Sequence, residues 1–336
     1  MYIWQKNQWQ HIMQKRETLP HALLLRGCAG IGKQDFALEL ARSLLCKAPI
    51  ETHACGECMS CLWFKEMHHP DFRMISPEDI ESSDDAPKKK TAKKSQISVS
   101  QIRQLIDYLS LSQHQVNGYR VILISPAETL NVASANALLK MLEEPPANTL
   151  FLLVTNQPQR LLATITSRCQ AIDMQLPTRQ VALNWLEQQN LANAESLLDY
   201  AGGAPLIALQ ADADADLTAD LIKQLALGAK LQPFMCAPML LSLGMELAID
   251  TLQKWIFDLT TYKLTQKSQY HTQHIRALQA LCKSVNLNLL LGFQQKLVYA
   301  KKMANHPLSN EMQLENILLH YTKIFSAKTI STQFCA

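Results

Sequence analysis

The chain has 336 residues, 48% of them apolar and 18% charged, which is an ordinary globular composition with room for two or three domains. A net charge of +3 argues against a protein that binds nucleic acid through overall charge alone. No secretory signal follows Met1 and no apolar window is long enough to span a bilayer, so we expect a cytoplasmic protein without membrane contacts.

Residues 19–170 alternate short apolar runs with amphipathic segments. The runs at 21–26, 72–75, 119–124 and 150–155 predict strands, and the segments at 33–46, 99–109 and 133–142 predict helices. Strands that alternate with helices indicate a parallel sheet with helices on both faces. The sequence therefore predicts an α/β domain at 1–172.

After Pro177 the pattern becomes wholly helical. Short helices are predicted at 180–189, 193–201 and 205–210, an Ala/Asp-rich linker at 211–216, and further amphipathic helices at 217–325. We therefore expect a small helical domain at 173–210 and an all-helical domain at 211–336.

The segment 77–96 differs from its surroundings, because an acidic stretch runs into the lysines at 88–94. Such a run could contact DNA phosphates. A solvated loop between two elements is the favoured interpretation, since charge runs of this kind are usually solvated.

A glycine-rich turn joins the first predicted strand to the first predicted helix. Its residues Gly27, Gly30, Gly32 and Lys33 have the spacing and context of a P-loop, in which backbone N–H groups surround phosphates and the lysine neutralises their charge. The pattern predicts a degenerate P-loop, because the residue after Lys33 is Gln34 where a Ser or Thr would ligate Mg²⁺.

The second half of an ATPase site is also incomplete. The strand at 121–124 is followed by Ser125 and Pro126, where an Asp and a Glu would hold Mg²⁺ and position water. Glu128 lies two positions too far along and is interpreted as a surface or cap residue. We predict that the chain does not hydrolyse ATP alone. ATP binding is doubtful, although Lys33 and the glycines leave it open.

Four of the nine cysteines are spaced C-x8-C-x2-C-x2-C within 46–61. They are Cys46, Cys55, Cys58 and Cys61, and four thiolates satisfy tetrahedral Zn²⁺. His53, His68 and His69 are nearby alternatives, but four thiols already close the shell. A closed site leaves no position for substrate, so we expect a structural zinc.

Several motifs of the first 210 residues together resemble the bacterial DNA polymerase III clamp-loader subunits, which have an AAA+ fold. The motifs are HALLL at 21–25, the glycine loop at 27–33, the four-cysteine insertion at 46–61, HPD at 69–71, NALLKMLEEPP at 136–146, FLLVT at 151–155, RLLA at 160–163 and SRC at 167–169. The block at 136–146 is the most specific of them. The helical region beyond matches by character and position only.

Within this family the departures favour the delta-prime branch over the ATPase motor subunits, gamma/tau. The motor subunits keep a Ser or Thr after the P-loop lysine and an Asp-Glu after the later strand, and this chain keeps neither. The resemblance implies that 173–210 is a lid domain and 211–336 a collar domain that holds a hetero-pentamer together.

The resemblance also assigns roles to single residues. Arg168 of the SRC motif, by itself an ordinary surface arginine, would act as an arginine finger in trans on a motor subunit's ATP. Thr155 occupies the sensor-1 position, with packing as its favoured role here. The implied partners are the gamma/tau and delta subunits, and through the assembly the sliding clamp and primed DNA, in the loading of that clamp during replication.

Two alternatives remain open. An active gamma/tau-like motor would use Gln34 and Glu128 as unusual substitutes for the missing ligands. A stand-alone zinc-ribbon nucleic-acid binder would use the lysines at 88–94.

Overall fold

The computed structural model of the protein describes residues 1–77, 96–110, 118–191, 193–303 and 309–326. The lysine run at 88–94 and nearly all of the charged segment 77–96 lie outside the described residues. The chain divides into two compact units, Met1–Pro177 and Thr178–Ala336. The expected division into three domains stays a prediction.

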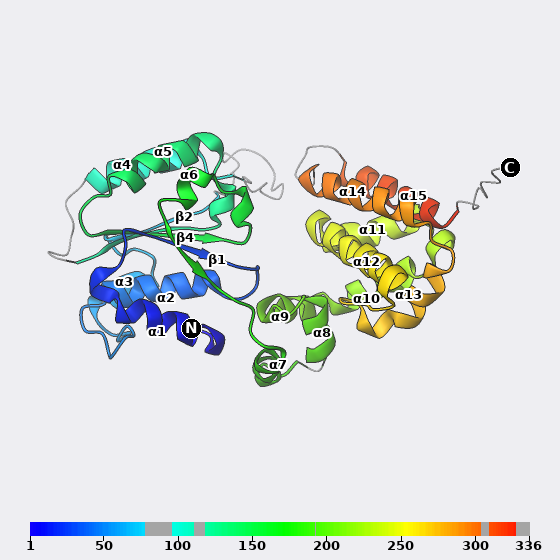
Figure 1. Ribbon diagram of the computed structural model, residues 1–336, viewed down its shortest axis with the longest axis horizontal. Coiled ribbons are helices and arrows are strands. Elements are labelled where there is room, and N and C mark those ends of the chain that lie inside the picture. Colours follow the sequence, from blue (N-terminus) through cyan, green and yellow to red (C-terminus); the bar gives the residue numbers. More distant parts are fainter. Residues whose placement is uncertain (78–95, 111–117, 192, 304–308, 327–336) are drawn as a thin grey trace, which may run out of the picture. The chain divides into compact units, whose positions relative to one another are not determined.

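The first unit is built on a parallel sheet of five strands in the order β2-β3-β4-β1-β5 (Figure 1). The strands are β1 (Ala22–Arg26), β2 (Phe72–Ile75), β3 (Arg120–Ile124), β4 (Thr149–Thr155) and β5 (Gln170–Asp173). The predicted α/β class is confirmed, and four of the strands lie where the sequence predicts them. Strand β5 was not predicted, because it is an edge strand whose side chains are mostly exposed.

Helices cover both faces of this sheet (Figure 1). One face carries α1 (Lys6–Gln14), α2 (Lys33–Leu45) and α3 (Met59–Lys65), and the other carries α4 (Val99–Ser110), α5 (Val132–Glu143) and α6 (Ala163–Thr166). Side chains alternate across a strand, so Leu23 and Leu25 pack with Phe36 of α2, while Leu24 packs with Leu138 of α5. The P-loop turn is therefore held between two buried elements.

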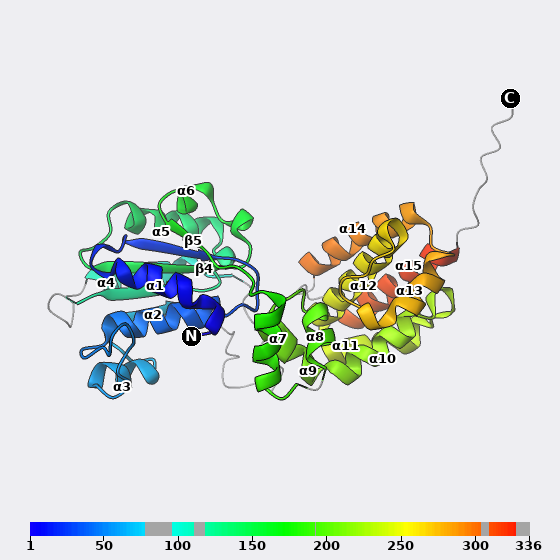
Figure 2. The same cartoon turned by 60° about the horizontal axis from the view of Figure 1, so that its bottom comes forward.

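The second unit is helical. Its helices are α7 (Arg179–Gln188), α8 (Ala194–Tyr200), α9 (Pro205–Ala213), α10 (Ala215–Leu225), α11 (Pro233–Leu243), α12 (Met245–Thr265), α13 (Ile275–Cys282), α14 (Leu287–Met303) and α15 (Asn310–Ser326). Helices α7 to α9 share one apolar cluster around Leu186, and α10 to α15 share another around Trp255. The long helix α12 packs against α13 and α14 (Figure 2).

The prediction of a linker at 211–216 is wrong. Helix α9 runs to Ala213 and α10 begins at Ala215, so only Asp214 separates them. Alanine has the highest helix propensity, and here it outweighs the preference of Asp for turns and caps.

No single helix among the described residues is long and apolar enough to cross a membrane. One consecutive pair, α11 and α12, meets the length and composition requirement only when the two are joined across a bend of 117°.

Candidate functional site

The P-loop turn leads from the end of β1 into the first turn of α2. Gly30 and Gly32 have left-handed φ values of 74° and 77°, which side chains with a Cβ rarely adopt. A Cβ on Gly27 would lie 2.2 Å from the carbonyl oxygen of Met174. The glycines therefore allow the turn and the close approach of the backbone at Met174.

Lys33 is buried, with 4% of its surface exposed, and its ammonium points back into its own loop. The Nζ atom donates to the carbonyl oxygen of Gly27 at 2.9 Å, to that of Cys28, and to Oδ1 of Asn156 at 2.7 Å. Burial lowers the pKa of Lys33 to about 8, although Cys28 and Glu128 act in the opposite direction. The lysine is thus bound by protein oxygens in the place of phosphate oxygens.

Gln34 and Ser125, the two departures from an ATPase motif, contact each other. Ser125 Oγ donates to Gln34 Oε1 over 3.1 Å, from the end of β3 to the start of α2. Ser125 is buried. Two neutral side chains therefore satisfy each other where a working site would present a hydroxyl and a carboxylate to Mg²⁺.

Glu128, which the sequence interprets as a surface or cap residue, is half-buried. Its Oε1 accepts the backbone N–H of Asn156 at 3.1 Å. Its Oε2 is buried and has no hydrogen-bond partner among the described residues. Glu128 therefore holds the loop after β4, and its charge offsets part of the lowering of the Lys33 pKa by burial.

Sequence reasoning missed Asn156. The neighbouring Thr155 is fully buried, and its Oγ1 accepts the backbone N–H of Gln157 at 3.1 Å. Asn156 instead reaches Lys33, because β4 lies beside β1 in the sheet and their carboxyl ends meet. The available signal was its position directly after a strand, but the strand order was needed to use it.

The N-terminal residues also contact the P-loop, which the sequence did not predict. Gln5 Nε2 donates to the carbonyl oxygens of Ile31 at 2.9 Å and Gly32 at 2.8 Å, and Trp4 Nε1 donates to Ile31 at 3.0 Å. The ring of Tyr2 lies against Gly32, where an added Cβ would come within 2.2 Å of it. This contact fixes the outer side of the loop.

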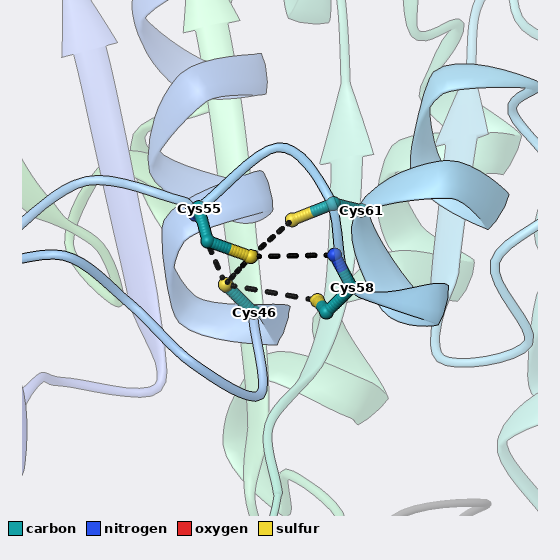
Figure 3. Close-up of side chains that lie close together, drawn as sticks. All are labelled: Cys46, Cys55, Cys58 and Cys61. Carbon is teal, nitrogen blue, oxygen red and sulfur yellow. Dashed lines mark hydrogen bonds between the residues drawn. The ribbon is translucent and has the colours of Figure 1, made fainter.

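The four clustered cysteines converge between the end of α2 and α3 (Figure 3). Their Sγ atoms all lie within 4.8 Å of one another, and the separations from Cys46 to Cys55 and Cys58 are 3.5 and 3.9 Å. Tetrahedral Zn²⁺ with Zn–S bonds of about 2.3 Å requires Sγ separations of about 3.8 Å. The donor set and its spacing fit a metal ion such as zinc.

Backbone groups support this cluster. The N–H of Cys55 points to Cys46 Sγ at 3.3 Å, and the N–H of Cys58 points to Cys55 Sγ at 3.4 Å. Backbone N–H donors from Cys58 and Glu57 lower the pKa of the Cys55 thiol, which favours the thiolate that a metal requires. Gly56, with a φ of 83°, makes the tight turn between these ligands.

Two of the neighbouring histidines, His53 and His69, have other contacts, and His68 is exposed. His53 stacks on Trp9 with ring centroids 4.8 Å apart. His69 is buried, accepts the N–H of Asp71 through Nδ1 at 3.0 Å, and contacts Ser60 Oγ through Nε2 at 2.8 Å. Ser60 in turn donates to the carbonyl oxygen of Leu45 at 2.6 Å. His69 thus ties the cysteine module to the end of α2.

Arg168 follows α6, and about a third of its side chain is exposed. Its Nη2 lies 2.6 Å from Oε1 of Glu143, the last residue of α5. Its Nη1 donates to the carbonyl oxygen of Thr164 at 3.0 Å. The guanidinium is therefore held by two helices and remains accessible.

Fold and site define an α/β protein with a P-loop that lacks the usual Mg²⁺ ligands and with a four-cysteine module beside it. Residues 4–178, just over half of the chain, match the family described as "DNA polymerase III, delta subunit". The chain belongs to this family.

The similarity is to the delta-prime branch, which confirms the implied assignment. Relatives named "DNA polymerase III subunit delta'" are 39% identical over 212 residues in Pseudomonas aeruginosa, 35% over 179 in Escherichia coli and 36% over 163 in Bacillus subtilis. The matches cover 62%, 53% and 48% of this chain and 60%, 49% and 44% of those relatives. They thus span about half the length of each protein.

Among solved structures, a DNA polymerase III gamma-subunit-related protein from Thermotoga maritima aligns with 94% of this chain and 99% of its own. The identity is 18% and the TM-score 0.44, a similarity too distant to carry an argument.

Proposed function

We propose that the chain is a delta-prime subunit of a bacterial clamp loader and does not hydrolyse ATP itself. The contact between Gln34 and Ser125 carries this proposal, because it replaces the Mg²⁺ ligands with a neutral pair. The three oxygen partners of Lys33 add to it, since a phosphate would have to displace them.

In this proposal Arg168 supplies the arginine finger for the ATP site of an adjacent motor subunit. Its guanidinium is accessible and pre-oriented, as stabilisation of charge on a transferring phosphoryl group requires. The chain thereby contributes to hydrolysis without a reaction centre of its own.

The partners are those implied by the family: gamma/tau and delta subunits in a hetero-pentamer held by collar domains. ATP bound by the motor subunits organises the ring around the sliding clamp, and hydrolysis releases the closed clamp on primed DNA. In this proposal the protein acts in the cytoplasm.

The cysteine module holds a structural Zn²⁺ through Cys46, Cys55, Cys58 and Cys61. Four thiolates fill the tetrahedral shell, so the ion has no open position for water or substrate. Its role is to fix the segment between α2 and α3 against the sheet.

The test distinguishes a subunit that does not hydrolyse ATP from an active motor subunit. With Mg²⁺ and ATP, we expect the purified chain to hydrolyse ATP no faster than a Lys33→Ala variant does. Omitting the chain from a loader reconstituted with motor subunits, delta, clamp and primed DNA should abolish clamp loading. Lysine-dependent turnover by the isolated chain, or loading that proceeds without it, would contradict the proposal.

The zinc-ribbon alternative has its own test. Tight, salt-sensitive DNA binding by the free chain, lost on deletion of 77–96, would favour that alternative. We expect the free chain to show no such tight binding to DNA.

A further inference from the structure

The ion pair between Arg168 and Glu143 joins residues of two different motifs, 25 positions apart in the sequence. Glu143 ends α5 within the block at 136–146, and Arg168 lies in the SRC motif after α6. We propose that Glu143 is a positioning residue that holds the guanidinium of Arg168 in its finger orientation. This inference rests on the proposed function.

The geometry leaves part of the guanidinium free. Arginine carries five N–H donors in a rigid plane, and here one edge is engaged by Glu143 Oε1 and another by the carbonyl oxygen of Thr164. Two acceptors from two different helices fix the direction of the plane. The remaining donors are available for phosphate oxygens of a neighbouring subunit.

The pair matters for orientation more than for stability. The side chains of Arg168 and Glu143 are 34% and 49% exposed, and ion pairs at such exposed sites contribute little to the stability of a fold. Removing Glu143 should therefore leave the fold and the assembly intact. It would free a long side chain to occupy several rotamers, and a finger that is not pre-oriented stabilises the transition state less.

The next residue provides a matched control. Glu144 carries the same charge, is exposed, and forms no ion pair with any residue that the structure describes. A Glu144→Ala variant therefore loses the same charge in the same segment without loss of the contact to Arg168.

The experiment uses the complete reconstituted loader with clamp, primed DNA and ATP. It compares wild type, E143A, E143Q, E144A, R168A and the E143A/R168A double variant, with assembly checked by size-exclusion chromatography. We expect E143A to lower kcat roughly fivefold with the KM for ATP within about twofold of wild type. E143Q, which keeps an acceptor, should recover part of the rate, and E144A should equal wild type.

The double variant decides how Glu143 acts. If Glu143 acts through Arg168, then E143A/R168A should be as slow as R168A and no slower. Wild-type activity of E143A, faster turnover, or a further loss in the double variant would each overturn the positioning role. If R168A is slow, those results leave the proposed finger role of Arg168 intact. A fully active R168A would instead overturn the proposed function itself.

Discussion

Lys33, the lysine of the P-loop sequence, donates its hydrogen bonds to oxygen atoms of the protein itself. Its ammonium is buried and its pKa is lowered to about 8, mainly by desolvation. Since the unfolded chain holds the same proton more tightly, the folded state binds fewer protons between about pH 8 and the ordinary value of 10.5.

Folding stability contributed by Lys33 should therefore rise with pH in that window. Measured by urea denaturation against a Lys33→Met variant, the wild type should gain about 2 kcal/mol between pH 8 and 10.5. The comparison cancels the titration of the tyrosines and cysteines that both proteins share. A difference in unfolding free energy that stays constant between pH 8 and 10.5 would contradict the claim that burial lowers the pKa of Lys33.

Asp258 is a second buried charge, in the helical unit. The carboxylate of this fully buried residue accepts the backbone N–H groups of Gln269 at 2.8 Å and His271 at 2.7 Å, and the Nδ1 of His271 lies 2.8 Å away. Burial raises the pKa of Asp258, but the hydrogen bonds from His271 and the backbone outweigh it and leave the pKa below its ordinary value. Asp258 thus fixes the loop after α12.

An Asp258→Asn variant should lose about 3 kcal/mol of unfolding free energy at pH 7, because it breaks a buried, hydrogen-bonded pair. The lowered pKa means that this contribution is present above about pH 4 and is lost as pH falls below it. In urea denaturation, the difference in unfolding free energy between wild type and Asp258→Asn should therefore become smaller below about pH 4. Asp250→Asn is the control, since the ion pair of Asp250 with Lys301 is half-exposed and should be worth less than about 1 kcal/mol. Equal losses in the two variants would refute the argument.

At the scale of elements, the cysteine module is docked on the α1–α2 side of the sheet by contacts other than the metal ligands. Trp9 of α1 donates through Nε1 to Thr52 Oγ1 at 3.0 Å, and Ser43 of α2 donates to the carbonyl oxygen of Thr52 at 2.7 Å. Loss of metal should therefore disorder the segment around Gly56 first and leave the sheet folded.

Cys55→Ala should reduce the bound zinc from about one ion per chain to nearly none and lower the melting temperature. Zinc is measured by elemental analysis of the purified chain. The exposed Cys28, which lies outside the cluster, provides the control: Cys28→Ala should retain the metal. Full zinc content in Cys55→Ala would show that the four thiols do not form the site.

The elements that the sequence predicted correctly depend on local patterns. The spacing of Cys46 to Cys61 and the replacement at Gln34 are both visible within a few residues. The contacts of Gln34 with Ser125 and of Lys33 with Asn156 join residues 91 and 123 positions apart, and the strand order was needed to find them. Strand β5 was missed for a physical reason as well, since an exposed edge strand has no apolar run.

At the scale of the whole molecule, the proposed function assigns this subunit a lost half and a retained half of an ATPase site. The half used in cis, around Lys33, is satisfied by protein atoms. The half that we propose acts in trans, Arg168, is accessible. In this proposal the chain depends on its neighbours for any part in ATP hydrolysis.

ATP turnover by the reconstituted loader, with the wild-type chain or with Arg168→Ala, tests this division most directly. The exposed Arg103 on α4 provides the control variant Arg103→Ala, which should behave as wild type. With assembly intact, we predict that Arg168→Ala lowers clamp-stimulated turnover by about tenfold or more, because a neighbouring site loses its finger. Unchanged turnover in an intact assembly would contradict the account and leave the chain a scaffold.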